Sequence, residues 1–309
     1  MAERKSEVEE YKPDLVIYHD KCMDGFTAAW AIWKRWPDAE FIARNYGQVP
    51  PPDLDGLHVL IVDFSFSEVI LRDMVDNGRA ASVVILDHHK TAQADLEPFA
   101  VFKEKPERFT LPVVSGMTRE LIGGGYCPIL ALFDMDRSGA GMAWDFAHGA
   151  DKGSRPGLVN LVEDRDLWRF AHGDRSKNLH LALQTSILSF GRWDEIEDNL
   201  ASVIEQGAAI AAWRDQLVEE IIERAHYRHI GGKRGIVVHC PYGLASDVCH
   251  ALLDEFEDAA FAAAIVCSGE ETSFSLRSRD DRADVSEIAR KWGGGGHRNA
   301  AGFKVPSGG

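Results

Sequence analysis

Cysteine is scarce in this chain. Its 309 residues include five cysteines, an odd number with no C-x-x-C pair. This argues against a disulfide framework and fits a reducing cytoplasm. No uninterrupted apolar run approaches about 18 residues, so we expect no transmembrane helix. The opening residues, MAERKSEVEEYK, are charged and have no hydrophobic region, so we also expect no secretory signal. The composition predicts a cytoplasmic protein that does not bind or span a membrane.

Positive charge is also in short supply. Lys and Arg number 34 against 49 Asp and Glu, a net charge of −15. Proteins that bind long nucleic acids do so largely by neutralising phosphates, so we expect no binding to long duplex nucleic acid. A short phosphorylated substrate stays compatible, because a metal site with local arginines can hold one despite the overall charge.

The first half of the chain alternates predicted strands with predicted helices. Strands are predicted at residues 14–19, 57–64, 82–87 and 127–134, and helices at 24–36, 67–78 and 138–149. Such alternation favours an α/β fold, a parallel sheet with helices on both faces. Ligand sites in these sheets lie at the carboxyl ends of the strands.

The second half predicts a helical segment and then a smaller α/β unit. The run 193–229 reads as one connecting helix or a helix pair. We therefore expect a first domain over 1–192, a helical linker over 193–230 and a second domain over 231–309. The stretch 96–126 is long for a connection within a sheet and is rich in proline and glycine. We expect a surface hairpin there, the alternative being a flap with glycine hinges.

Polar side chains end three of the predicted strands. His19, Asp63 and the run Asp87–His89 each fall at a strand's carboxyl end. A single terminal Asp is more often a helix cap or turn residue. Three strand ends of this kind, two of them with imidazoles, should instead converge in space. The sequence therefore predicts one polar site at this edge of the sheet.

The residues expected at this site suit metal ions. They are His19, Asp20, Cys22, Asp24, Asp63, Asp87, His88, His89 and either Asp164 or Asp166. Carboxylates and imidazoles without a cysteine pair favour Mn²⁺ or Mg²⁺ over structural zinc. So many acids would repel one another without cations, so we infer two metals, roughly 3.5–4 Å apart with Asp63 as the bridge. Such a pair activates water for displacement at phosphorus.

A glycine run near the C-terminus predicts a second binding element. The segment GGGGHRN, residues 293–299, offers backbone N–H groups without Cβ obstruction. His297 and Arg298 follow the glycines, and Arg277 and Arg279 lie on the preceding predicted strand. A lone glycine run is more often a flexible tip. Joined to this cationic cluster, it predicts a clamp for an anionic substrate.

These segments resemble a known family. HDKCMDGFTAA, VDFS, LDHHKTA and EDRDLW, in this order, are similar to the four motifs of the DHH phosphoesterase superfamily. SLRSR, DVSEIA and GGGGHRNAAGF resemble its DHH-associated C-terminal domain. The resemblance spans about residues 14–303. It implies two domains with an active-site cleft between them, a dinuclear Mn²⁺ site and hydrolysis of phosphodiester or phosphoanhydride bonds.

The resemblance also implies a role for individual residues. The metal ligands would be His19, Asp24, Asp63, His88 and Asp166, with Asp63 bridging the two ions. Asp87 would orient its motif, and His89 would contact the scissile phosphate. The far end of the substrate would be bound by Gly295, Gly296, His297 and Arg298, helped by Arg277. The family has an aspartate where this chain has Cys22. Either the thiolate joins a metal, or Asp20 takes the place, or that metal binds more weakly. We expect a small buried Cys22 with Asp20 compensating.

The leading hypothesis is a metal-dependent phosphodiesterase. It would release nucleoside monophosphates from short RNA or DNA oligonucleotides or from linearised dinucleotides, using two divalent ions, Mn²⁺ first and Mg²⁺ as the alternative. The enzyme alternatives are a phosphatase of bisphosphorylated nucleoside and an exopolyphosphatase-like hydrolase. A non-catalytic nucleotide sensor is the third reading. Tryptophans spaced by three along residues 24–36 favour core packing and leave room for a homodimer. Trp168 is the best candidate for contact with a base, although packing is the more common role of such a ring.

Overall fold

The computed structural model describes residues 10–103, 105–149 and 155–307. Its contacts divide the chain into two compact units, Met1–Ile210 and Ala211–Gly309. The division falls within α9, Leu200–Ile222. No helix in the described ranges combines the length and the apolar character needed to cross a bilayer.

A five-stranded parallel sheet forms the centre of the first unit. Its order is β2-β1-β3-β4-β5, with β1 Leu15–His19, β2 Glu40–Arg44, β3 His58–Val62, β4 Ser82–Asp87 and β5 Ile129–Phe133. The register pairs Tyr18 with Val62 and Val62 with Leu86. The residues that follow these three, His19, Asp63 and Asp87, therefore lie level with one another at one edge of the sheet. This alignment is the physical reason that three separate polar segments meet.

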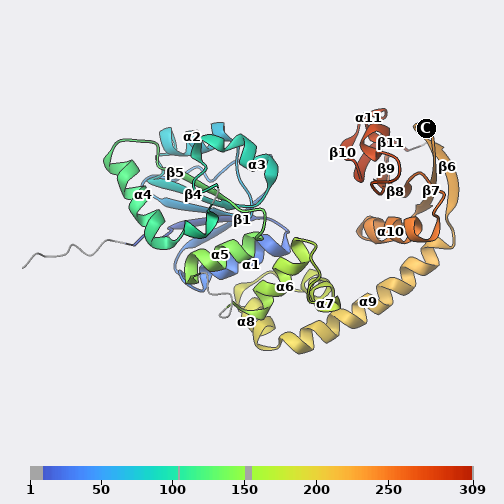
Figure 1. Ribbon diagram of the computed structural model, residues 1–309, viewed down its shortest axis with the longest axis horizontal. Coiled ribbons are helices and arrows are strands. Elements are labelled where there is room, and N and C mark those ends of the chain that lie inside the picture. The colour runs from blue at the N-terminus through green and yellow to red at the C-terminus, as the bar shows by residue number, and fades with distance from the viewer. Residues whose placement is uncertain (1–9, 104, 150–154, 308–309) are drawn as a thin grey trace, which may run out of the picture. The chain divides into compact units, whose positions relative to one another are not determined.

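Helices cover both faces of this sheet (Figure 1). Successive strand side chains point to opposite faces, so each strand contributes to two apolar layers. One layer packs on α1 Met23–Trp33, α4 Leu111–Gly123 and α5 Gly139–His148. The other packs on α2 Glu68–Asp76 and the segment around α3 Lys90–Asp95. The predicted α/β class and the parallel sheet are confirmed.

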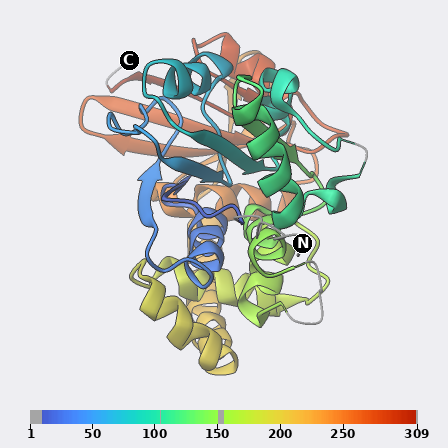
Figure 2. The same ribbon diagram turned by 90° about the vertical axis from the view of Figure 1, so that its left-hand side faces the viewer.

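A further helical layer lies against α1 and α5 on the side away from the sheet (Figures 1 and 2). It consists of α6 Gly157–Asp166, α7 Asp174–Gln184, α8 Phe190–Asp198 and the start of α9. The buried rings of Phe26, Trp30 and Trp193 fill this interface. Because α6 ends in Asp166, this packing also determines where that carboxylate lies.

The expected hairpin at 96–126 is wrong. The segment contains the short 3₁₀ turns η1 Glu97–Phe99 and η2 Pro106–Arg108, followed by α4. Pro112 lies in the first turn of α4, where the missing N–H costs nothing. Leu111 and Val114 are buried in the core beneath it. The proline that suggested a loop therefore begins a core helix.

The second unit is a six-stranded mixed sheet of order β10-β11-β9-β8-β7-β6, in which β7 and β8 form the one parallel pair of the described strands. The strands are β6 His226–Ile230, β7 Lys233–His239, β8 Ala262–Ser268, β9 Glu271–Arg277, β10 Gly295–His297 and β11 Ala300–Pro306. Helix α10, Ala245–Glu255, covers one face, and α11, Val285–Arg290, covers the other. The short 3₁₀ turn η4, Tyr242–Leu244, precedes α10. The sequence predicted none of the strands β2, β6, β10 and β11.

Candidate metal centre

Asp63 is the centre of the polar site. Its side chain is fully buried and its backbone has a φ of +60°. Few residues other than glycine adopt this left-handed conformation, and Asp is among those that tolerate it. Asp63 Oδ1 lies 3.0 Å from His88 Nε2, and Oδ2 lies 3.5 Å from His19 Nδ1. The carboxylate therefore directs one oxygen to each of two histidines on neighbouring strand ends.

Three groups of potential ligand atoms overlap at this point. They are His19, Cys22 and Asp63; Asp63, His88 and His89; and Asp24, His88 and Asp166, with the ligand atoms of each group within 4.8 Å of one another. His88 Nε2 is 3.6 Å from both Asp24 Oδ2 and Asp166 Oδ2. The side chains expected as ligands thus lie together, joined through Asp63 and His88.

Two backbone amides of α5 orient the Asp24 carboxylate. Asp24 Oδ2 accepts from Gly139 N at 2.6 Å, and Oδ1 accepts from Ala140 N at 3.0 Å. The positive end of a helix stabilises a carboxylate in this position. The sequence predicted the capped helix 138–149 but not its contact with Asp24. The contact depends on how α5 packs against α1.

Asp87 holds the two histidines that follow it. Its Oδ1 accepts from His88 N at 2.7 Å, from His89 N at 3.2 Å and from His89 Nδ1 at 2.7 Å. The bond at Nδ1 places the proton there and leaves His89 Nε2 for another partner. Asp87 is thus engaged in fixing local geometry, whereas His88 and His89 present ring nitrogens to the site.

The buried carboxylates of the site repel one another, which shifts the pKa values of several groups. Burial raises the pKa of Asp24, and repulsion from Asp63 and Asp166 raises it further. Burial alone would raise the pKa of Asp63, but the imidazoles of His19 and His88 outweigh it and hold that pKa well below its usual range. Burial also raises the pKa of the Cys22 thiol, together with the charges on Asp63 and Asp24. A divalent cation would relieve this repulsion.

Several buried polar atoms at the site have no hydrogen-bond partner among the described residues. They include His19 Nδ1, Asp63 Oδ2 and Asp87 Oδ2. Unpartnered buried polar atoms are rare because each costs free energy. His19 Nδ1 and Asp63 Oδ2 belong to the same group of potential ligands. The nitrogen and oxygen donors therefore fit a divalent metal.

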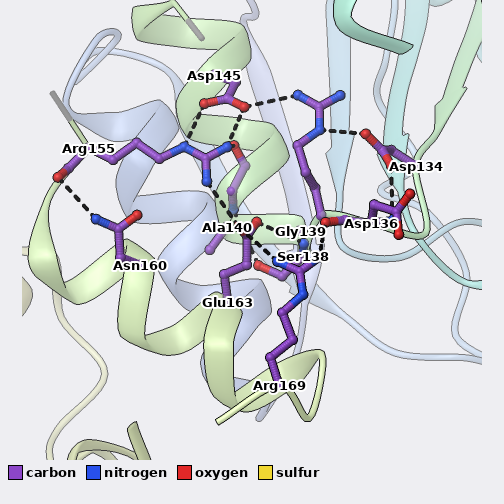
Figure 3. A network of polar contacts seen from close by, with 12 residues as sticks. Asp134, Asp136, Ser138, Gly139, Ala140, Asp145, Arg155, Asn160, Glu163 and Arg169 are labelled. Carbon is purple, nitrogen blue, oxygen red and sulfur yellow. Dashed lines mark hydrogen bonds and ion pairs between the residues drawn. The ribbon is translucent and has the colours of Figure 1, made fainter. Parts of the chain in front are cut away.

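Of the three acidic residues near the end of α6, one approaches the site and two form contacts that hold the fold together. Glu163 accepts from Ser138 N at 3.1 Å and from the buried Arg155 at 3.0 Å, within the network drawn in Figure 3. Asp164 accepts from Ser176 Oγ at 2.5 Å and from the backbone of the next loop. Only Asp166 of the three approaches His88. Of Asp164 and Asp166, the geometry therefore brings Asp166 to the candidate site.

Cys22 lies with the ligands and Asp20 does not. Cys22 directly precedes α1, and its sulfur is grouped with His19 and Asp63. Asp20 belongs to none of the ligand groups in the part of the chain that the structure describes. The expected compensation by Asp20 therefore has no counterpart in the geometry.

Tyr46 is a neighbour of the site that the sequence did not predict. Its ring meets the rings of His19 and His89 edge to face, with centroids 5.5 Å and 6.2 Å apart. Burial and the carboxylates of Asp87 and Asp63 raise the pKa of its phenol. Tyr46 follows β2, the strand that was not predicted, so no pattern in the sequence pointed to it.

The glycine segment of the second unit borders a groove of about 630 Å³. Arg277, Gly295 and Gly296 line it, together with Tyr242 and residues of β9 and β11. His297 and Arg298 are exposed and are not part of this lining. Arg298 instead donates to the carbonyl of Asp280 at 2.9 Å. The structure thus gathers part of the expected clamp, while Arg298 holds a neighbouring loop.

Comparisons with known proteins agree with this architecture. Residues 232–309 match the DHHA1 domain. The uncharacterized protein R106 of Acanthamoeba polyphaga mimivirus is 27% identical over 313 residues, which cover 94% of this chain and 67% of that protein.

Two solved structures share the fold. The pGpG-specific phosphodiesterase PggH of Vibrio cholerae aligns with a TM-score of 0.51 at 12% identity, over 96% of this chain and 94% of that one. The DHH domain of a protein described as a member of a ribosomal protein family aligns with a TM-score of 0.55 at 13% identity, over 96% and 83%. The comparisons thus show a DHHA1 domain over residues 232–309 and a fold that the chain shares with these two structures over most of its length.

Proposed function

We propose that the chain is a metal-dependent phosphodiesterase that hydrolyses short oligonucleotides or linearised dinucleotides to nucleoside monophosphates. The observation that carries this proposal is the buried Asp63 carboxylate, whose two oxygens face His88 and His19. One carboxylate shared between two groups of ligands is the arrangement that a two-metal site requires.

Two divalent ions, Mn²⁺ or alternatively Mg²⁺, would activate a water molecule and offset charge on the phosphoryl oxygens when bound. His19, Asp24, Asp63, His88 and Asp166 would hold them. Neighbouring groups hold these ligands and His89 in position. The amides of α5 fix Asp24, so that this ligand needs little rearrangement. Asp87 accepts from His89 Nδ1 and raises the pKa of this ring, and the protonated ring would donate a hydrogen bond from Nε2 to a phosphate oxygen.

Features outside the metal centre favour a nucleotide substrate. Trp168 follows Asp166 by two residues, and its side chain is 59% exposed. The guanidinium of Arg165 lies 4.1 Å from its ring centroid. An exposed aromatic ring of this kind suits stacking on a base, a contact worth about 1–3 kcal/mol. We infer that Trp168 binds a base of the substrate.

The groove of the second unit is the proposed site for the far end of the substrate. Arg277 and the backbone of Gly295 and Gly296 offer a cation and N–H groups suited to phosphate. An acidic chain with one such groove suits a short oligonucleotide better than a long one. The structural neighbour PggH is named for hydrolysis of pGpG, which supports a dinucleotide as the first substrate to test. All five cysteines are free, which supports a cytoplasmic location.

Product analysis with Mn²⁺ tests the proposal. The purified chain would be offered a two-nucleotide RNA, a longer RNA, a cyclic dinucleotide, bisphosphorylated adenosine and polyphosphate. Monophosphate from the dinucleotide, declining with chain length, is the expected result. Orthophosphate from the bisphosphate or polyphosphate alone would replace the proposal with a phosphatase. Binding without turnover under any metal would replace it with a nucleotide sensor.

The role of Trp168 has a separate test. In Trp168→Ala the KM for the dinucleotide should rise about 5- to 100-fold, the range that one lost stacking contact allows. Hydrolysis of a phosphodiester without a base is the matched control and should not change. Equal losses on both substrates would show that Trp168 supports the metal site rather than a base.

A further inference from the structure

We propose that the thiolate of Cys22 is a metal ligand, and that the two ions of the centre are therefore of different kinds. The group of His19, Cys22 and Asp63 would take a thiophilic or borderline divalent ion such as Zn²⁺ or Co²⁺. The group of Asp24, His88 and Asp166 would take Mn²⁺ or Mg²⁺. The inference rests on the proposed metal centre and goes further by assigning a distinct ion to each half.

The position of Cys22 is set by the fold. It is the residue before α1, and its carbonyl accepts from Phe26 N at 3.0 Å in the first turn of the helix. Its side chain does not cap the helix. The sulfur is therefore held beside the site by the backbone while remaining unused in the structure of the helix itself.

The two side chains grouped with Cys22, His19 and Asp63, indicate a bound ion even without the cysteine. Asp63 is fully buried, and its Oδ2 makes no hydrogen bond with any described residue. His19 Nδ1 is likewise buried without such a bond, and the two atoms are 3.5 Å apart. Both lie in the group that contains Cys22 Sγ. An unsatisfied oxygen and an unsatisfied nitrogen therefore converge where the sulfur lies.

The two groups of donors differ in chemistry. A thiolate with one imidazole and one carboxylate favours Zn²⁺ and related ions, because soft sulfur binds these ions best. Two carboxylates with one imidazole favour harder ions, Mn²⁺ and Mg²⁺ among them. All five cysteines are free, so Cys22 is not committed to a disulfide. The difference between the two metal-binding groups follows from a single residue, Cys22.

Cobalt absorption tests the inference directly. Metal-free protein would be titrated with Co²⁺, and the thiolate-to-cobalt charge-transfer band in the near ultraviolet would be followed together with bound cobalt per chain. The wild type should develop the band, and Cys22→Ser and Cys22→Asp should lose it. Cys267→Ser, which removes an exposed thiol of the second unit, is the matched control and should retain it.

Competition between ions gives a second readout. Cys22→Asp should still bind two ions, but its preference for Zn²⁺ over Mn²⁺ should fall by about tenfold or more, within the effects known for changes around metal ligands. Cobalt bound by the wild type without the band, or a band that persists in Cys22→Ser, would overturn the inference and leave the proposed function intact. A wild type that binds no divalent ion would overturn the metal centre, and with it both proposals. Circular dichroism of each variant separates these results from misfolding.

Discussion

Gly139 approaches Asp63 so closely that no side chain fits between them. A β-carbon at Gly139 would lie 2.4 Å from Asp63 Cβ and 2.8 Å from its Oδ1. Gly25 has the same relation to His19, with 2.7 Å between an added β-carbon and His19 Cβ. The first turns of α5 and α1 can therefore reach the strand ends only because these positions are glycine. The approach brings the amide of Gly139 to Asp24.

Gly139→Ala should displace Asp63 and weaken metal binding. We expect Mn²⁺ affinity and turnover to fall about 10- to 100-fold, as for changes that disturb the support of a ligand. Calorimetric titration with Mn²⁺ measures the first and product analysis the second. Gly116→Ala is the control, because nothing lies within 4 Å of an added β-carbon there. It should stabilise α4 by roughly 0.5–1 kcal/mol and leave Mn²⁺ affinity unchanged. Equal Mn²⁺ affinity in both variants would contradict the prediction.

Loss of a central ligand should abolish turnover without unfolding the chain. Asp63→Asn keeps the shape of the side chain, and Asn tolerates the positive φ at this position. His88→Ala removes the ring that three carboxylates approach. We expect both variants to lose turnover by more than about 100-fold, since even outer partners of ligands cost 10- to 100-fold. Asp53→Asn, at an exposed position, is the control for a lost carboxylate. Full activity in either ligand variant would refute the assignment.

Gly295 and Gly296 should respond differently to alanine. Nothing lies within 4 Å of a β-carbon at Gly295, so Gly295→Ala should fold normally while its methyl group narrows the groove. Its KM for the dinucleotide should rise. Gly296 has a φ of +137°, and a β-carbon there would lie 2.5 Å from the carbonyl oxygen of Ala300. Gly296→Ala should lose about 1–3 kcal/mol of stability, measured by urea unfolding. An unchanged KM in Gly295→Ala would place substrate binding elsewhere.

The buried network of Figure 3 should be important for stability. Arg155 forms ion pairs with Asp145 and Glu163, and all three side chains are at least nine-tenths buried. Arg155→Met would remove the buried cation that joins the two carboxylates and would leave Asp145 only Arg137 and Glu163 only the more exposed Arg169. The expected loss is at most about 3–5 kcal/mol, the cost of breaking comparable buried pairs. Arg79→Met is the control, because the pair of Arg79 with Asp55 is exposed and should contribute little. Similar free energies of unfolding for the two variants would argue against the network.

Asp164 should make stability depend on pH in the acid range. Burial alone would raise its pKa, but hydrogen bonds from Ser176 and from the amides of Ala171 and His172 outweigh it and lower the pKa below the usual 3.8. A group with a depressed folded pKa stabilises the fold above its unfolded pKa and loses this contribution as the pH falls through the folded value.

The comparison of wild type with Asp164→Asn measures this effect. The difference in free energy of unfolding should be constant from pH 7 down to about pH 5 and should shrink below about pH 4. Asp136→Asn, at an exposed position, is the control and should show no such change. A difference that grows on acidification would have the wrong sign for this mechanism.

The sequence by itself predicted four of the five strands of the first sheet and most of the residues that meet at its edge. Runs such as SVVILD predict buried strands because β-branched residues fit a sheet that is covered on both faces. The carboxyl ends of parallel strands share one edge, so the sequence alone predicts that His19, Asp63 and Asp87 lie together. Pattern alone failed at the half-exposed β2 and at α4, where Pro112 resembled a loop signal.

Only the tertiary structure decided which neighbouring acids act together. Glu163, Asp164 and Asp166 are alike in sequence, but helix geometry points each in a different direction, toward Arg155, Ser176 and His88 respectively. The same holds for Cys22 and Asp20, of which Cys22 alone joins the ligands. Spacing along a chain limits which residues can meet. Which of them do meet depends on the packing of α1, α5 and α6 against the sheet, because contacts between distant segments set each side chain's direction.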